Sequence, residues 1–281
     1  MSVEGRRRRM GCARPRDPSF LRVRKRMRAL VIIVLALIGS AEAQKGGADP
    51  KHEILKRLHD PDAVRRRDAL LLLGTFNDAP LSPLIQRAMD DPDPGVRAAA
   101  ITALGYASPP ENASNAQELI PTLLRALKDS HPLVRRAAAG ALGRVRDPHA
   151  VRALQEAARD RDAAVRAAAV EALGEQGDRA ALTTLLERLR DKDPFVRRQA
   201  ARALGRLRAP TALAALLECL VREEDMEVKR AIAWALGEIG NPHAAETLRT
   251  LSRSTDPYLS ATAREALKRL TPDATVRSRK R

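Results

Sequence analysis

Apolar positions recur along this chain with a helical period, and the whole pattern returns about every 31 residues. The segment Val-Arg-x-x-Ala-x-x-Ala-Leu-Gly occurs in five close copies, after a looser first copy at Val64–Gly74 and before a last one, without the glycine, at Leu259–Lys268. The glycines of the six copies that have one are 31, 38, 31, 31 and 32 residues apart. A fixed period of this length, with helical patterns inside each unit, is typical of stacked helical repeats. The close copies are Val96–Gly105, Val134–Gly143, Val165–Gly174, Val196–Gly205 and Val228–Gly237.

Each unit predicts two helices. In the unit Asp178–Gly205, leucines lie at i, i+3, i+4 and i+7 of an amphipathic first helix (Leu182, Leu185, Leu186 and Leu189). Asp193 is expected to cap the second helix, because its carboxylate can accept the free amide protons of the first turn. Asp162 and, as a weaker cap, His131 occupy the same place in other units. Pro194 suits the first helical position, where no amide proton is needed. We expect Gly205 to end the second helix, as glycine commonly does.

This pattern resembles the HEAT repeats of the short subclass named for phycobilisome lyases, over about residues 51–270. The resemblance implies an all-α fold, a right-handed α–α superhelix of about seven two-helix repeats. In that family, the acid five residues before the repeat valine and the arginine after that valine form a structural ladder between neighbouring repeats. The residues at these positions are Asp91 with Arg97, Asp129 with Arg135, Asp160 with Arg166 and Asp191 with Arg197. Glu223 with Lys229 is a conservative variant, and the last repeat has Ser254 and Ser260 instead.

The residues before the repeats have the features of an export signal. A basic stretch at Arg22–Arg28 precedes the apolar run Ala29–Gly39, and small residues follow up to Ala43. The run is shorter than the about 20 residues that span a bilayer, so contact with the membrane is expected only in transit. We predict a periplasmic or secreted protein cleaved after Ala43. A buried or anchoring helix is the open alternative.

The predicted organisation is therefore a basic leader with signal peptide (1–43), a linker (44–50), a solenoid (51–271) and a basic tail (272–281). Translation starts at Met1 or at Met27; the sequence leaves both open. The stretch Tyr106–Gln117, which lengthens one repeat by seven residues and is rich in Pro, Asn and Ser, is expected to protrude as a loop.

The net charge of +16 is concentrated at the two ends of the chain rather than in the repeats. Residues 1–28 hold eleven Lys or Arg against two acids, and the last six residues add four basic side chains. The repeats themselves carry only roughly +4, with a single tryptophan. Recognition of nucleic acid needs a concentrated basic surface, so the charge argues against it.

No motif for catalysis or for metal binding is apparent. The five histidines are scattered, and none lies beside a second histidine or cysteine at ligand spacing. The single pair His52-Glu53 is fewer than the several that the HEAT-repeat enzyme deoxyhypusine hydroxylase needs for its irons. Cys219 has no activating base near it in the sequence, and no phosphate-binding glycine loop or nucleophile elbow occurs. We expect no catalytic residue, no metal and no cofactor.

The variable positions of the repeat give the best functional signal. Residues three and seven before the repeat glycine lie on one helix face, and on two adjacent units they are Arg198, Arg202, Arg230 and Trp234. Arginine and tryptophan are enriched in binding hot spots. In HEAT proteins the second helices line the concave surface, so we predict that these four residues bind an acidic peptide or another protein. A solvated basic face with Trp234 tucked between helices is the open alternative.

The sequence thus favours an exported, non-catalytic scaffold for protein–protein interaction. Two alternatives remain from other classes. One is a component of an enzyme like the bilin lyases, which the resemblance suggests. The other is a nucleic-acid-binding protein, as in HEAT-like DNA glycosylases.

Overall fold

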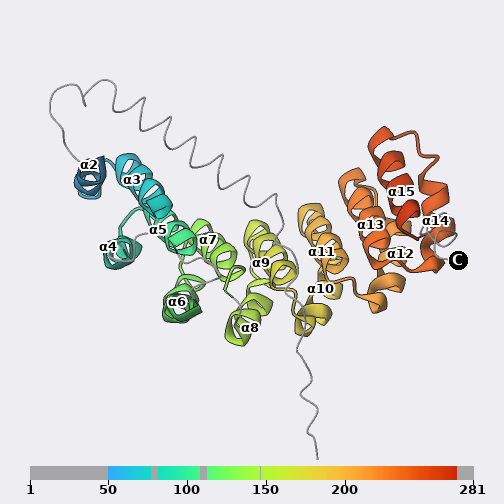
Figure 1. Ribbon diagram of the computed structural model, residues 1–281, viewed down its shortest axis with the longest axis horizontal. Helices are drawn as coiled ribbons and strands as arrows, with labels where there is room; N and C mark the ends of the chain where they lie inside the picture. The colour runs from blue at the N-terminus through green and yellow to red at the C-terminus, as the bar shows by residue number, and fades with distance from the viewer. Residues whose placement is uncertain (1–49, 77–81, 108–112, 146, 271–281) are drawn as a thin grey trace, which may run out of the picture. The chain divides into compact units, whose positions relative to one another are not determined.

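The computed structural model describes residues 50–76, 82–107, 113–145 and 147–270 (Figure 1). Within these ranges the chain forms helices and the turns between them, and no strand. The chain divides at Glu53 into two compact units. Of the first unit only residues 50–53 are described, so the fold below is that of the second. The predicted leader, cleavage site and basic tail lie outside the described residues.

Seven helix pairs follow one another along the described residues. From the second pair onward, the first helix packs on the second, and each second helix packs on the second helix of the next pair, so that Figure 1 shows α4 to α14 in one row and α3 to α15 in another. The first helices are α2 (Pro50–Arg57), α4 (Ser82–Arg87), α6 (Ala113–Ala126), α8 (Pro148–Ala157), α10 (Leu182–Arg188), α12 (Leu213–Arg222) and α14 (Ala245–Leu251). The second helices are α3 (Ala63–Phe76), α5 (Pro94–Ala107), α7 (Pro132–Leu142), α9 (Ala163–Gln176), α11 (Pro194–Arg206), α13 (Met226–Ile239) and α15 (Pro257–Leu270). The predicted all-α superhelix of about seven repeats is confirmed.

The predicted caps are also confirmed. The Asp193 carboxylate accepts a hydrogen bond from the amide of Phe195 at 2.9 Å, and Pro194 occupies the first turn of α11. Asp162 caps α9 in the same way, and the His131 ring accepts from the amide of Leu133 at the start of α7. Local sequence therefore sets where each second helix begins.

Five of the six repeat glycines lie inside their helices, so the prediction that Gly205 ends its helix was wrong; the exception is Gly143, which directly follows α7. Gly205 lies inside α11, which continues to Arg206, whereas α9 ends at Gly177 with φ of 70°. Each repeat glycine lies at the point where the second helix of the following repeat crosses its own helix. A methyl group at Gly174 would lie 2.7 Å from Cβ and 2.9 Å from Cα of Ala203. The absence of a side chain thus allows successive helices to approach closely. The same contact recurs at Gly74, Gly105, Gly143, Gly205 and Gly237.

The predicted loop at Tyr106–Gln117 was wrong for most of its length. Tyr106 and Ala107 belong to α5, and residues 113–117 form the first turns of α6. Only residues 108–112 lie outside the described part of the chain. The insertion extends α6 to 14 residues, against 7 in α10. Alanine and glutamine in this stretch are good helix formers, which explains the difference.

An arginine ladder joins the repeats. Arg166 of α9 donates through Nε and Nη2 to the carboxylate of Asp191 in the next repeat, at 2.9 and 2.8 Å, and through Nη1 to the backbone carbonyl of Asp160 in its own repeat, at 3.0 Å. Each arginine therefore ties its own turn to the following one. The side-chain pairs are Arg66–Asp91, Arg97–Asp129, Arg135–Asp160, Arg166–Asp191 and Arg197–Glu223.

The ladder ends differently from the expectation. Glu223 and Lys229 form no ion pair with each other among the described residues; Glu223 is held by Arg197. Arg230, one position further along α13, reaches Asp256 of the last repeat with Nη2 at 2.9 Å. The planar guanidinium presents two donors in a fixed fork that matches a carboxylate, whereas an ammonium group acts as a point charge.

Hydrogen bonds keep the ladder acids charged. Those from Arg135 hold the pKa of Asp160 below its ordinary value, and those from Arg97 do so for Asp129. Burial alone would raise the pKa of Asp191. The hydrogen bonds from Arg166 and from the Asp193 amide outweigh burial, and the pKa is lowered.

A second row of charges occupies the position directly after the repeat glycine, which Lys268 replaces in the last repeat. Its members alternate in sign from one repeat to the next: Arg144, Glu175, Arg206, Glu238 and Arg269. Arg269 forms an ion pair with Glu238. Desolvation and the neighbouring Glu171 raise the pKa of Glu175, and Arg206 and Arg144 oppose that rise. Neighbouring repeats thus present opposite charges to one another along this row.

Gly174→Ala and Gly140→Ala should change stability in opposite directions. A methyl group at Gly174 would overlap Ala203, so we expect the free energy of unfolding to fall by about 1–3 kcal/mol. Nothing lies within 4 Å of a methyl group at Gly140, inside α7, where alanine should add about 0.5–1 kcal/mol. Urea unfolding followed by circular dichroism measures both. Equal shifts would contradict the close-approach role.

Arg166→Ala should be costly because it removes the two-donor partner of a buried carboxylate and leaves Asp191 only the longer contact with Arg188, at 3.3 Å. The Asp191 side chain is 4% exposed, so we expect a loss of about 3 kcal/mol. The matched control is Arg159→Ala, which removes an ion pair to Glu187 whose side chains are 59% and 42% exposed, and which should cost less than about 1 kcal/mol.

The effect of Arg166→Ala should also depend on pH. The folded-state pKa of Asp191 is lowered, so its contribution to stability is complete above the unfolded-state pKa of about 4 and is lost as the pH falls through the folded-state value. The difference between variant and parent should therefore shrink below about pH 4. A difference that stays constant down to pH 2.5 would contradict the charged pair.

Candidate functional site

The four residues of the predicted patch lie together on two adjacent second helices. Arg198 and Arg202 belong to α11, and Arg230 and Trp234 belong to α13. They line one hollow of about 180 Å³. Its remaining lining residues are Glu227, Ala231 and Thr262. The hollow therefore spans the last three repeats.

Two aromatic rings that the sequence analysis missed flank this hollow. The Arg198 guanidinium lies over the Phe195 ring, 4.7 Å from its centre, and that of Arg230 lies over the Tyr258 ring at 4.9 Å. Phe195 and Tyr258 are exposed, at 43% and 68%. Such stacking fixes the cation on the ring face.

The rings occupy one position of the repeat, in the first turn of the second helix. Large apolar residues fill it in alternate repeats, and all of them are exposed: Val64, Leu133, Phe195 and Tyr258. Gly95, Ala164 and Glu227 occupy it in the repeats between. The sequence therefore does contain a signal for the two rings: the first turn of every second repeat's second helix carries a large apolar side chain that faces solvent.

Carboxylates offset part of the positive charge. The Glu227 carboxylate lies 3.9 Å from Nη1 of Arg198 and 2.5 Å from Nη1 of Arg230. Asp256 accepts from Arg230, and these hydrogen bonds hold the pKa of Asp256 below its ordinary value. Arg202 is exposed, and within the described ranges no hydrogen bond or ion pair engages its side chain. The patch is less cationic than the sequence suggests, and Arg202 is the cation in it that the described residues leave without a partner.

Trp234 has two environments. Its ring lies over the glycine of the preceding repeat, since a methyl group at Gly205 would be 2.7 Å from Trp234 Cζ3. The side chain is nevertheless only half-buried and lines the hollow. The residue is thus packed between α11 and α13 and is also accessible from the hollow.

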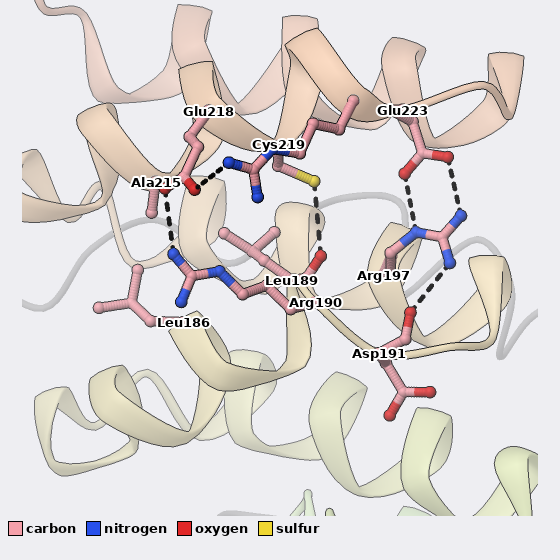
Figure 2. A pocket seen from close by; sticks show the side chains of 10 residues that line it. Leu186, Leu189, Arg190, Asp191, Arg197, Ala215, Glu218, Cys219 and Glu223 are labelled. Atoms are coloured by element: carbon pink, nitrogen blue, oxygen red, sulfur yellow. Dashed lines mark hydrogen bonds and ion pairs between the residues drawn. The ribbon is translucent and has the colours of Figure 1, made fainter.

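A second pocket, of about 320 Å³, lies between α10 and α12 (Figure 2). Cys219 points into it, with Sγ 3.4 Å from the carbonyl oxygen of Leu189. Burial, and after it the nearby Glu223, raise the pKa of the thiol. Arg190 pairs with Glu218 at 3.0 Å, and the Arg197–Glu223 pair lies beside it. A protonated thiol without a base beside it is a poor nucleophile.

The described residues contain no group of three His, Cys, Asp or Glu side chains placed to hold a metal ion. None of the helices described is both long and apolar enough to cross a membrane.

Comparisons with known proteins agree with this architecture. A family model for HEAT repeats matches residues 52–115, 81–163, 152–225 and 217–268. Among solved structures, YibA of Escherichia coli is 22% identical with a TM-score of 0.61, covering 80% of this chain and 84% of that one. An engineered protein is 21% identical with a TM-score of 0.52, covering 79% and 68%. The CpcE–CpcF complex of phycocyanin lyase from a Nostoc species is 21% identical with a TM-score of 0.50, covering 81% and 97%.

At these identities the likeness shows the fold alone. A comparison with curated proteins gave no match. The family model, however, covers the described repeats from the first to the last. The chain therefore belongs to the HEAT-repeat family.

Proposed function

We propose that this protein is a non-catalytic scaffold that binds an acidic segment of another protein on the surface formed by its second helices. The observation that carries the proposal is the composition of the hollow on α11, α13 and α15. Its lining includes Arg202, which has no partner among the described residues, and the half-buried Trp234, and the exposed rings of Phe195 and Tyr258 lie beside it under Arg198 and Arg230. Aromatic residues and arginine dominate the binding energy of many protein interfaces.

The repeat contacts support such a role because they hold the surface in place before a partner arrives. The glycine–alanine contacts and the arginine ladder fix each second helix against the next. Binding then requires little ordering of the backbone, which lowers its entropic cost. In a HEAT solenoid the second helices are expected to line the concave side, where an extended segment can contact several repeats.

The alternatives have less support. Binding of nucleic acid would need several unpaired cations in a row, whereas Arg198 and Arg230 of the hollow already contact carboxylates. The likeness to phycocyanin lyase concerns the fold, and the one cysteine of the described residues has a raised pKa. Neither observation suggests a bilin-transfer site in this chain.

We also propose that the protein is exported to the periplasm or the medium. The support is the order of a basic stretch, an apolar run and small residues before Gln44. On this proposal the partner is an exported protein as well.

Replacing Arg202 and Trp234 together by alanine should weaken binding of a partner by more than about tenfold, because both sides of the hollow lose their main contacts. The partner is captured by cross-linking in native cells, identified by mass spectrometry, and titrated by calorimetry. The control is Arg136→Ala, an exposed arginine on the equivalent face of α7, which should leave affinity unchanged. Circular dichroism should show equal helicity in all three proteins. Unchanged binding by the double variant would exclude this surface.

N-terminal sequencing of the protein from fractionated native cells should find a mature end at Gln44 in the exported fraction. Leu35→Arg, which places a charge in the apolar run, should leave an uncleaved chain in the cytosol. If the unaltered protein is itself cytosolic and uncleaved, the export proposal fails. The bilin and nucleic-acid alternatives would then return.

A further inference from the structure

We propose that the hollow between α11, α13 and α15 is a carboxylate-binding subsite, and that Glu227 occupies it until an acidic side chain of the partner displaces it. This inference rests on the proposed function and specifies its chemistry. It makes Glu227 an internal competitor of the partner.

The position of Glu227 shows that the subsite accepts a carboxylate. Glu227 lies in the first turn of α13 and reaches both Arg198, on the neighbouring helix, and Arg230. Two cations from different repeats thus converge on one acid. A glutamate or aspartate of a partner would present the same group from outside.

Glu227 can leave this position without disturbing the fold. Its side chain is 56% exposed, and its contact with Arg198 is long, at 3.9 Å. Asp256, the other acid near the hollow, is 18% exposed and also caps α15 by accepting from the amide of Leu259. Asp256 is therefore a fixed part of the structure, whereas Glu227 is replaceable.

The arginines are prepared to receive the incoming group. Stacking on Phe195 and Tyr258 holds the guanidinium groups of Arg198 and Arg230 in place. Nε of Arg198 is buried and has no hydrogen-bond partner within the described part of the chain. An incoming carboxylate would instead meet Arg198 at Nη1, the atom that faces Glu227.

The charge balance favours a peptide carboxylate over a polyanion. Arg202 has no partner in the described part of the chain, and displacement of Glu227 would release two more guanidinium contacts while Asp256 stays bound. One or two acidic side chains would satisfy these donors, and an apolar neighbour could pack on Trp234. A run of phosphates would need more free cations than the hollow offers.

Glu227→Gln should raise affinity for an acidic peptide by about fivefold, since it keeps the size of the side chain but removes the competing charge. Arg202→Ala should lower affinity by about tenfold. The probe is hexaglutamate at fixed ionic strength, with hexaglutamine as the uncharged control. Trp234, the single tryptophan of the chain, reports occupancy of the hollow through its fluorescence.

The matched control is Glu187→Gln, which removes an exposed glutamate on the first helix α10, and which should leave the titration unchanged. If Arg202→Ala weakens binding but Glu227→Gln equals the parent, the competitor role is overturned while the proposed function stands. If hexaglutamate leaves Trp234 fluorescence unchanged even in Glu227→Gln, the carboxylate subsite is overturned. A response to a single-stranded oligonucleotide in place of hexaglutamate would overturn it in favour of nucleic acid.

Discussion

The contact between a glycine of one second helix and an alanine of the next is the constraint on which the rest of this structure depends. A methyl group at Gly174 or at Gly237 would come within 2.7 Å of the following helix. The helices can lie this close only because one of them has no side chain at the crossing. That spacing decides how far each arginine of the ladder must reach, and which side chains of neighbouring repeats can meet at the surface.

The ladder and the hollow are two results of the same spacing. Arg166 can bridge the carbonyl of Asp160 and the carboxylate of Asp191 because consecutive turns lie within one side-chain length. At the C-terminal end, the bridging role passes to Arg230, which also lines the hollow. A residue that appeared from the sequence to serve only binding thus also joins α13 to the last repeat.

Much of the fold could be predicted from the sequence, because caps and helical periods are local. Asp193 and Asp162 cap as expected for that reason. The role of Gly205 was wrong because a glycine at a helix end and a glycine at a helix crossing recur with the same spacing. The repeat period predicted that four residues would lie together: Arg198, Arg202, Arg230 and Trp234. It did not predict which carboxylates the arginines contact. Glu227 and the two aromatic rings lie in the first turns of second helices, and Asp256 lies just before α15. Contacts between repeats at these positions depend on geometry that a linear pattern does not contain.

The alternation of charge after the repeat glycines has a consequence for how such a chain can change length. Removing the single repeat that carries Glu175 would bring Arg144 beside Arg206, and like charges would then face each other across the junction. Removing two repeats together would restore the order of signs. The large apolar residues in the first turn of the second helices also recur every two repeats, at Leu133, Phe195 and Tyr258. The module that could be inserted or deleted without bringing like charges together in this row is therefore a pair of repeats, although the fold itself is built from single ones.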